Sequence, residues 1–308
     1  MASTFRFSTS LGDIPIAEIG PRSKRAEELG YSAVSISDHF WAQPAPLIGL
    51  TAAALATTTL RVIPLVLAND YREPLVLAKE LATLDALSGG RLEFGIGAGW
   101  LTTDYEESGI QLDSPGTRIR RLSEAVDIFR GLLAGEAVDV QGEFYNVTAT
   151  LSAPLPAQST VPLLLAGGKQ KMLTLAGAKA DIVGYNPGLT AGVIDERAGR
   201  NATAEKTDEK MSWIRDGAGG RFDSLELQSR IHAAVITDDR EAVASELAPL
   251  LGITAEDALA SPHALVGTVE QCVDELQRWR DRWGISYVSI GSGEMEAFAP
   301  VVEALTGK

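Results

Sequence analysis

Two residues that could do chemistry stand side by side in the chain, Asp38 and His39. They end the run AVSISDH at 33–39, whose small and β-branched first half predicts a strand buried on both faces of a parallel sheet. An imidazole can move a proton near neutral pH or donate a hydrogen bond to a reactive ring. The alternative is structural: either the two residues form a satisfied pair, or Asp38 is the N-cap of a helix. Because α/β proteins place their chemistry at the carboxyl ends of parallel strands, we expect His39 in the active site.

Glycine clusters follow two other predicted strands. GIGAGW at 95–100 lacks the spacing of a dinucleotide fingerprint, but glycines let the backbone approach a flat ring or a phosphate closely. GGK at 167–169 follows a strand and opens a helix, an arrangement that binds anions through free N–H groups and the helix dipole. Each cluster also has a structural interpretation, a tight turn at a crowded barrel rim for the first and an ordinary strand-to-helix turn for the second.

Strands and helices alternate along most of the chain, which predicts a parallel sheet. The predicted strands are 5–11, 33–37, 60–68, 92–98, 161–166, 181–185, 231–237 and 287–290. The predicted helices are 18–29, 47–57, 73–88, 118–133, 171–178, 240–250, 254–259, 269–283 and 296–305. About eight strands is the number that a single (β/α)8 TIM barrel requires, so we expect this α/β fold, with a doubly wound sheet as the alternative.

Three segments depart from this alternation. Pro64 cannot donate to a sheet ladder, so it predicts a bulge within the third strand. The alternating stretch 137–148 predicts a small hairpin outside the main repeat. Region 190–221, rich in charge, Gly and Ala, is expected to be an insertion, a helix with a mobile loop over one face. No break in composition divides the chain, so we expect residues 1–308 to form one domain with this insertion.

Composition narrows the classes of function. The chain has 41 acidic and 27 basic residues, a net charge of -14, which argues against nucleic acid or an anionic membrane as a partner. The single cysteine, Cys272, excludes an intrachain disulfide and suits a reducing cytosol. Neither a secretory leader nor an apolar run of about 20 residues is found, so we expect a cytoplasmic protein. Three scattered histidines without metal-ligand spacing predict no metal site.

Taken together, these segments resemble the luciferase-like family of flavin and deazaflavin oxidoreductases. The resemblance is carried by AEELGYSAVSISDHF, by the stretch from LRVIPLVLAND to LSGGRLEFGIGAGW, by VPLLLAGGKQKMLTLAGAKADIVGYNP and by LVGTVEQCVDELQRWRDRWGISYVSI. No single piece is specific, but their order along the chain is. The branch that the chain resembles most uses the deazaflavin coenzyme F-420.

The resemblance implies a TIM barrel that holds the ring of coenzyme F-420 at the carboxyl ends of its strands. It implies that a bulge in the third strand backs this ring, with a non-proline cis peptide matching the Leu65–Val66 bond. Thr103 matches a position where a related enzyme has a cofactor-binding asparagine. The implied cofactor-binding residues are Asp38, His39, Leu65, Val66, Ala98, Gly99, Thr103, Ala166, Gly167 and Gly168.

Two departures from the family pattern concern the substrate. A related sugar-phosphate dehydrogenase has a glutamate acid after the glycine turn, where this chain has Trp100. The tryptophan of that enzyme lies a few residues beyond its histidine, whereas Trp41 here is two positions from His39. Trp41 and Trp100 therefore predict a more apolar substrate pocket, and they argue against sugar-phosphate oxidation.

The sequence thus predicts an oxidoreductase that transfers a hydride between coenzyme F-420 and a small organic substrate. His39 would position or protonate the reacting group, and Asp38 would fix the orientation of His39. An FMN-dependent monooxygenase of the same fold is the alternative, and a carrier that binds the cofactor without turnover is a third hypothesis. The family resemblance also implies a homodimer.

Overall fold

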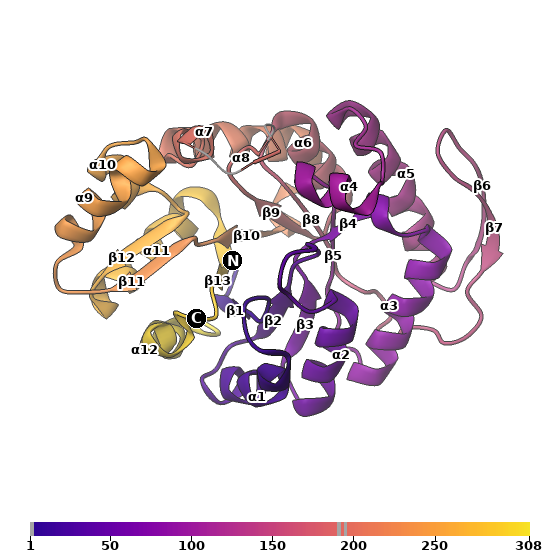
Figure 1. Ribbon diagram of the computed structural model, residues 1–308, viewed down its shortest axis with the longest axis horizontal. Helices are drawn as coiled ribbons and strands as arrows, with labels where there is room; N and C mark the ends of the chain where they lie inside the picture. The colour runs from indigo at the N-terminus through magenta and orange to yellow at the C-terminus, as the bar shows by residue number, and fades with distance from the viewer. Residues whose placement is uncertain (1–2, 190–191, 194–195) are drawn as a thin grey trace.

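The chain folds around a parallel barrel, shown in the computed structural model of Figure 1, which describes residues 3–189, 192–193 and 196–308. Nine sheet strands follow the order β3-β2-β1-β13-β10-β9-β8-β5-β4. Since only Leu65 and Val66 separate β3 from β4, these two form one interrupted strand and the barrel has eight, as predicted. The strands are β1 Arg6–Ser10, β2 Ala33–Ile36, β3 Arg61–Pro64, β4 Leu67–Ala68, β5 Phe94–Gly97, β8 Leu163–Gly167, β9 Ile182–Tyr185, β10 Glu226–Arg230 and β13 Ile285–Ile290.

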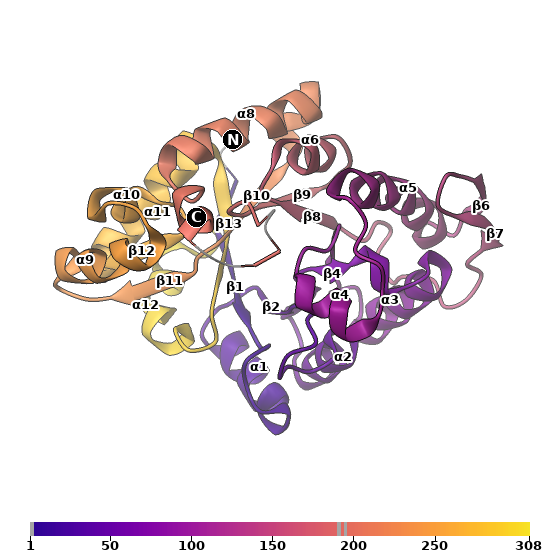
Figure 2. The ribbon, with the colours of Figure 1, turned by 45° about the horizontal axis from the view of Figure 1, so that its top comes forward.

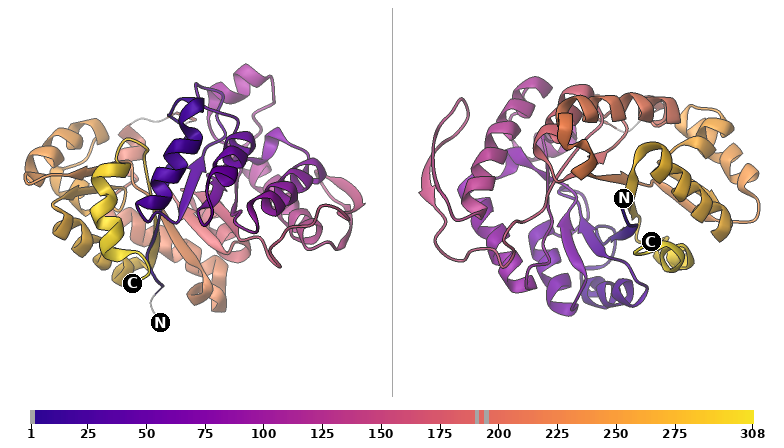
Figure 3. Two further views of the ribbon diagram at one scale, coloured as in Figure 1. Left: turned by 90° about the horizontal axis from the view of Figure 1, so that it is seen from below. Right: turned by 180° about the vertical axis from the view of Figure 1, so that it is seen from behind.

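Helices cover the outside of the barrel (Figures 1 and 3). Local sequence explains several of their ends: α2, α3 and α5 have proline in the first turn, and α11 starts with a capping box between Thr268 and Gln271. The helices are α1 Ile19–Glu28, α2 Pro46–Ala56, α3 Pro74–Ser88, α5 Pro115–Leu133, α6 Gln170–Lys179, α8 Ala204–Ala218, α11 Val269–Trp283 and α12 Met295–Leu305. The chain ends meet, since the Phe5 N–H donates to the Lys308 carbonyl at 3.0 Å.

The third strand has the bulge that Pro64 predicts. It is interrupted at Leu65–Val66, and the peptide bond between these residues is cis, as the family resemblance implied. The Leu65 N–H still donates to the Ile36 carbonyl of β2 at 2.9 Å. Gly95 of β5 lies so close that a Cβ atom there would be 2.1 Å from the Pro64 carbonyl oxygen. Glycine at this position therefore lets β5 pack against the bulge.

The seventh barrel strand differs from the prediction. Region 231–237 was expected in the barrel, but β10 takes that place and pairs in parallel with β9 and β13. The predicted strand is β11 Ala233–Ile236, which pairs with β12 Ala264–Gly267 in a separate two-stranded sheet. α9 Arg240–Leu251 and α10 Ala255–Ala260 connect these two strands and lie beside them in Figure 1. The sequence of β10, ELQSR, hides the strand because polar Gln228 and Ser229 are buried in it.

Smaller elements surround the barrel. The predicted hairpin is confirmed as the antiparallel pair β6 Ala137–Gln141 and β7 Asn146–Thr150. In region 190–221, residues 190–191 and 194–195 lie outside the described part, and the remainder contains α7 Glu196–Arg200 and α8, which packs against α6 (Figure 2). The sequence analysis missed the short helix α4 Thr102–Ser108, which follows β5. Three 3-10 turns complete the fold: η1 Ile16–Glu18, η2 Asn69–Tyr71 and η3 Gly219–Ser224.

Candidate active site

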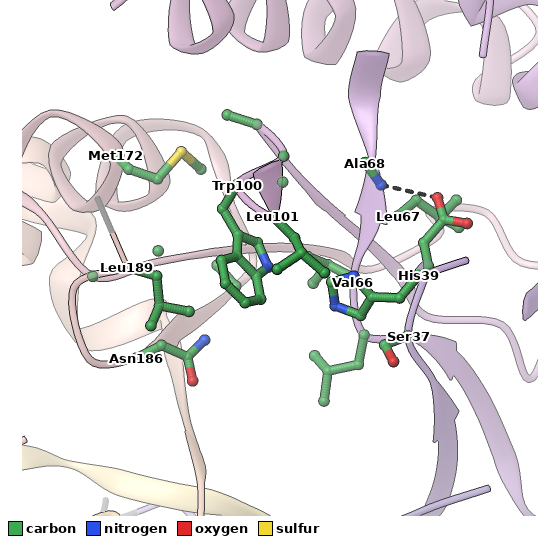
Figure 4. Close-up of a pocket in the computed structure, with 18 of the residues that line it drawn as sticks. Ser37, His39, Val66, Leu67, Ala68, Trp100, Leu101, Met172, Asn186 and Leu189 are labelled. Carbon is green, nitrogen blue, oxygen red and sulfur yellow. Dashed lines mark hydrogen bonds between the residues drawn. The ribbon is translucent and has the colours of Figure 1, made fainter. Parts of the chain in front are cut away.

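A cavity of about 410 Å³ opens at the carboxyl ends of the barrel strands (Figure 4). It collects nearly all the side chains and glycines that the sequence singled out, although they come from four different strand ends. The predicted site residues that line it are Asp38, His39, Trp41, Leu65, Val66, Ala98, Gly99, Trp100, Ala166, Gly167 and Gly168. Thr103 is exposed on α4 and does not line this cavity.

The His39 ring is held by a carboxylate that the sequence analysis did not identify. His39 Nδ1 lies 2.6 Å from Asp104 Oδ2, and Asp104 also accepts from the Phe40 N–H at 3.3 Å. The Tyr71 hydroxyl donates to the same carboxylate at 3.4 Å. Burial and the charges of Asp104 and Asp38 raise the pKa of Tyr71, so the phenol stays protonated and can donate. With Asp104 accepting the Nδ1 proton, His39 Nε2 is the ring nitrogen left for another partner.

Asp38 has a different role from the predicted one. Its carboxylate accepts from both terminal nitrogens of Arg72, at 2.6 and 3.0 Å, and from the Ala68 N–H at 3.0 Å. Figure 4 shows the bond to Ala68 beside His39. Asp38 therefore ties the end of β2 to β4 and the η2 turn, while Asp104 orients the His39 ring. The expectation that Asp38 fixes His39 is wrong, because its acceptor oxygens are directed toward Arg72 and Ala68.

Aromatic rings surround His39. The Trp41 ring centroid lies 4.0 Å from that of His39, and Trp100 meets His39 edge-on at 5.6 Å. In Figure 4 the Trp100 ring extends into the cavity next to Leu189. Gln43 fixes the loop that carries Trp41, because its side-chain amide donates to the carbonyls of Ser37 and His39 at 2.7 and 3.0 Å. The histidine thus sits between indoles that limit the access of water.

The first glycine turn places the start of α4. Gly99 has φ +71°, and a Cβ atom there would lie 1.9 Å from the Tyr105 hydroxyl oxygen. Arg118 of α5 reaches this turn and donates to the Ala98 carbonyl at 3.1 Å and to the Gly99 carbonyl at 3.4 Å. The turn is therefore a rigid part of the cavity wall, fixed by α4 on one side and by α5 on the other.

The second glycine turn lies at the N-terminus of α6. Gly168 packs against the loop after β9, where a Cβ atom would be 2.4 Å from the Pro187 carbonyl oxygen. Lys169 follows as the N-cap residue of α6, exposed at the rim of the cavity. A helix N-terminus next to a lysine favours a phosphate or another anion.

These parts fit a flavin-like cofactor. Leu65 and Val66 form an apolar wall against which a flat ring can lie, and His39 stands beside this wall at the end of the neighbouring strand β2. The turn at Gly168 and Lys169 is placed to receive a phosphate-bearing tail.

Among the described residues, no group of three or more His, Cys, Asp or Glu side chains is arranged to hold a metal ion. None of the described helices has the length and apolar character of a membrane span.

Asp104 and Arg72 belong to the site although the sequence did not single them out. Each contacts a residue that is far away in the sequence. Asp104 lies 65 residues from His39, and Arg72 lies 34 residues from Asp38. A usable signal existed for Asp104, since an acidic residue a few positions after a glycine turn at a strand end is placed to enter a barrel mouth. For Arg72, the only signal in the sequence was its position after the third strand.

The fold and the site define a TIM-barrel protein with a cofactor-sized cavity at the carboxyl ends of its strands. The family model described as luciferase-like monooxygenase matches residues 1–259. The chain belongs to this family, whose members are oxidoreductases and monooxygenases.

The chain has sequence relatives at moderate identity. The F420-dependent glucose-6-phosphate dehydrogenase of Amycolatopsis mediterranei is 30% identical over 177 residues, covering 53% of each chain. An uncharacterized protein of Mycobacterium tuberculosis is 33% identical over 184 residues, covering 52% of this chain and 62% of its own. These matches thus span 53% and 62% of the relatives' length, less than two thirds of either.

Solved structures confirm the architecture. The coenzyme F420-dependent tetrahydromethanopterin reductase from Methanopyrus kandleri superimposes with a TM-score of 0.77 at 20% identity, covering 98% of this chain and 99% of the other. At this identity the likeness establishes the shared barrel fold over nearly the whole chain.

Proposed function

We propose that this protein is an oxidoreductase that transfers a hydride between coenzyme F-420 and a small organic substrate. The observation that carries the proposal is the Asp104-held His39 next to the apolar Leu65–Val66 wall at the barrel mouth. Membership of the luciferase-like family and the similarity to an F420-dependent dehydrogenase support it.

Different residues would bind the cofactor, handle the proton and exclude water. Leu65 and Val66 would back the ring, and the turns at 98–99 and 166–168 would hold the rest of the cofactor. Coenzyme F-420, when bound, supplies a ring carbon that accepts or donates the hydride. His39 Nε2 would hold or deliver a proton at the reacting group of the substrate, while Trp41 and Trp100 keep bulk water out.

The proposal is tested first by cofactor binding. Oxidised coenzyme F-420 and FMN are titrated separately into the purified protein, and the fluorescence of each cofactor reports the complex. We expect tight binding of the deazaflavin and weak binding of FMN. Tight FMN binding with weak binding of coenzyme F-420 would contradict the proposal and direct the substrate search to oxygen-dependent reactions.

The role of His39 is tested by His39→Ala. Because the imidazole would act on the reacting group, we expect kcat to fall about 10²- to 10⁴-fold, the usual range for a lost acid or base. The dissociation constant of coenzyme F-420 should change far less, since the apolar wall and the glycine turns remain. Unchanged turnover in His39→Ala would remove this residue from the mechanism.

The second candidate function is an FMN-dependent monooxygenase, favoured by the description of the family model. It requires the same cavity with a different cofactor and molecular oxygen as co-substrate. Oxygen consumption that depends on an organic substrate, measured with FMN and a reductant, would support this candidate over hydride transfer to or from coenzyme F-420.

We also propose that residues 1–308 act as one domain and assemble as a cytoplasmic homodimer, as the family resemblance implies. Exposed apolar side chains on the outer faces of α2 and α3 are available for such an interface: Ile48, Leu55, Val76 and Leu87. Light scattering on the purified protein measures the assembly directly, and a monomeric mass would contradict it.

A further inference from the structure

β10 forms one wall of the cavity. In the order of the eight barrel strands, the interrupted strand β3–β4 is third and β10 is seventh, so they lie on opposite sides of the barrel. Gln228 and Arg230 are alternate residues of β10 and both line the cavity, followed by His232. A substrate placed over a cofactor ring that rests on Val66 would therefore face this β10 wall.

Arg230 brings a positive charge into the cavity without a matching carboxylate. It forms no ion pair with any described residue, and its Nη1 donates to the Ile290 carbonyl and to Ser289 Oγ. Glu294 and Asp13 act on its charge at longer range, and neither lines the cavity. A largely buried guanidinium without a close counter-charge is costly. A bound anion would supply the missing negative charge.

The neighbours of Arg230 define which anion fits. Gln228 is 1% exposed, and its Nε2 has no hydrogen-bond partner in the described structure. His232 is exposed where it lines the cavity. Desolvation and the charge of Arg230 lower the pKa of its imidazole to about 4, so it adds no second charge at neutral pH. The wall thus offers one positive charge and a free amide donor, which matches a monoanion.

We propose that Arg230 and Gln228 bind a carboxylate of the substrate, and that the protein acts on small organic acids with an apolar body. The planar fork of arginine donates two parallel hydrogen bonds to a carboxylate. Trp41, Trp100 and Leu189 line other parts of the cavity and would hold the apolar body near His39. This inference rests on the proposed function, and it replaces a wholly apolar substrate with an amphipathic one.

The test compares two ligands that differ only in their acid or amide group with a third aromatic ligand that carries a phosphate. Cinnamate, its neutral isostere cinnamamide, and phenyl phosphate are titrated by calorimetry into the protein, alone and saturated with coenzyme F-420. We expect cinnamate to bind at least about tenfold tighter than cinnamamide, as charge-assisted hydrogen bonds allow, and tighter than phenyl phosphate. Arg230→Met should abolish this preference and Arg230→Lys should reduce it. Arg278→Met, which removes an equal charge from an exposed helix position, should leave it unchanged.

Two outcomes would overturn the inference, and a third separates it from the proposed function. Equal affinities of cinnamate and cinnamamide for the wild-type protein would exclude a carboxylate site, and this comparison needs no variant to fold. Tighter binding of phenyl phosphate would replace the carboxylate with a phosphate. If coenzyme F-420 fails to bind while the protein alone prefers cinnamate, the proposed cofactor is wrong and the carboxylate site stands.

Discussion

The His39 ring is fixed on several sides before any ligand arrives. Asp104 accepts a hydrogen bond from Nδ1, and two indoles pack around the imidazole. A carboxylate in this position selects the tautomer, because it requires a donor at Nδ1. The same pairing keeps Nε2 directed to the site in enzymes that use a histidine–aspartate pair. Asp104 is therefore a positioning residue for His39.

Replacement of Asp104 by Asn tests this role. The amide keeps the size of the side chain but can donate to Nδ1 and so favour the wrong tautomer of His39. We expect Asp104→Asn to lower kcat at least about 10-fold and by up to about 10⁴-fold, the loss known for replacing an aspartate that orients a catalytic histidine. The dissociation constant of coenzyme F-420 should stay within a few-fold of the wild-type value. Steady-state kinetics and cofactor titration measure the two quantities.

Glu106→Gln is the matched control for Asp104→Asn. Glu106 is an exposed carboxylate on the same short helix, so its loss changes the charge of α4 without touching His39. We expect wild-type kcat for this control. Equal losses in both variants would mean that the charge of α4, and not the contact with His39, matters.

At the scale of elements, the glycine turn after β5 connects the barrel to α4. Gly99 and Gly109 both have φ +71°, but a Cβ atom meets the Tyr105 hydroxyl only at Gly99, and at Gly109 it meets nothing within 4 Å. In both alanine variants, the left-handed backbone conformation costs about 1–2 kcal/mol. Only the first also displaces Tyr105, whose hydroxyl donates to Asp70 at 3.0 Å.

We therefore expect Gly99→Ala to destabilise the protein more than Gly109→Ala, by about 1–3 kcal/mol, the usual cost of forcing extra atoms into a packed site. It should also weaken cofactor binding, because the turn lines the cavity. Urea unfolding and cofactor titration of both variants provide the comparison. Equal unfolding free energies would show that Tyr105 moves aside without cost.

The elements also show how much of the fold and of the site could be predicted from the sequence. The barrel, the bulge at Pro64, the hairpin and the strand-end position of His39 follow from local patterns and from their order along the chain. β10 was missed because its buried Gln228 and Ser229 break the apolar run by which a strand is recognised. The partner of His39 was missed because Asp104 reaches it only through the barrel closure and the placement of α4, which no local pattern specifies.

At the scale of the whole molecule, the two ends of the barrel have different roles: one holds the cavity, and the other holds ion pairs that stabilise the fold. The cavity lies at the carboxyl ends of the strands, while a cluster of ion pairs away from the cavity lies at the amino ends. There Glu93 binds Arg6 of β1 and Arg61 of β3, with Arg61 Nε at 2.7 Å, and Arg6 Nε donates to Glu226 of β10 at 2.6 Å. This cluster joins strands from around the barrel.

Glu93 tests this division. Its side chain is 2% exposed, so Glu93→Gln leaves the charges of Arg6 and Arg61 facing each other in a largely buried place. Removal of one partner from a buried ion pair typically costs about 3–5 kcal/mol. Glu143→Gln breaks the pair with Arg120, in which both side chains are 57% exposed, and should cost less than about 1 kcal/mol.

Urea unfolding of the Glu93→Gln and Glu143→Gln variants gives the two stabilities, and titration with coenzyme F-420 reports the opposite end of the barrel. We expect Glu93→Gln to lower the unfolding free energy strongly while the folded variant keeps its cofactor affinity, because no residue of this cluster lines the cavity. If cofactor affinity falls together with stability, the two ends are coupled through the strands. The barrel would then transmit changes at its amino end to the site rather than isolate the site from them.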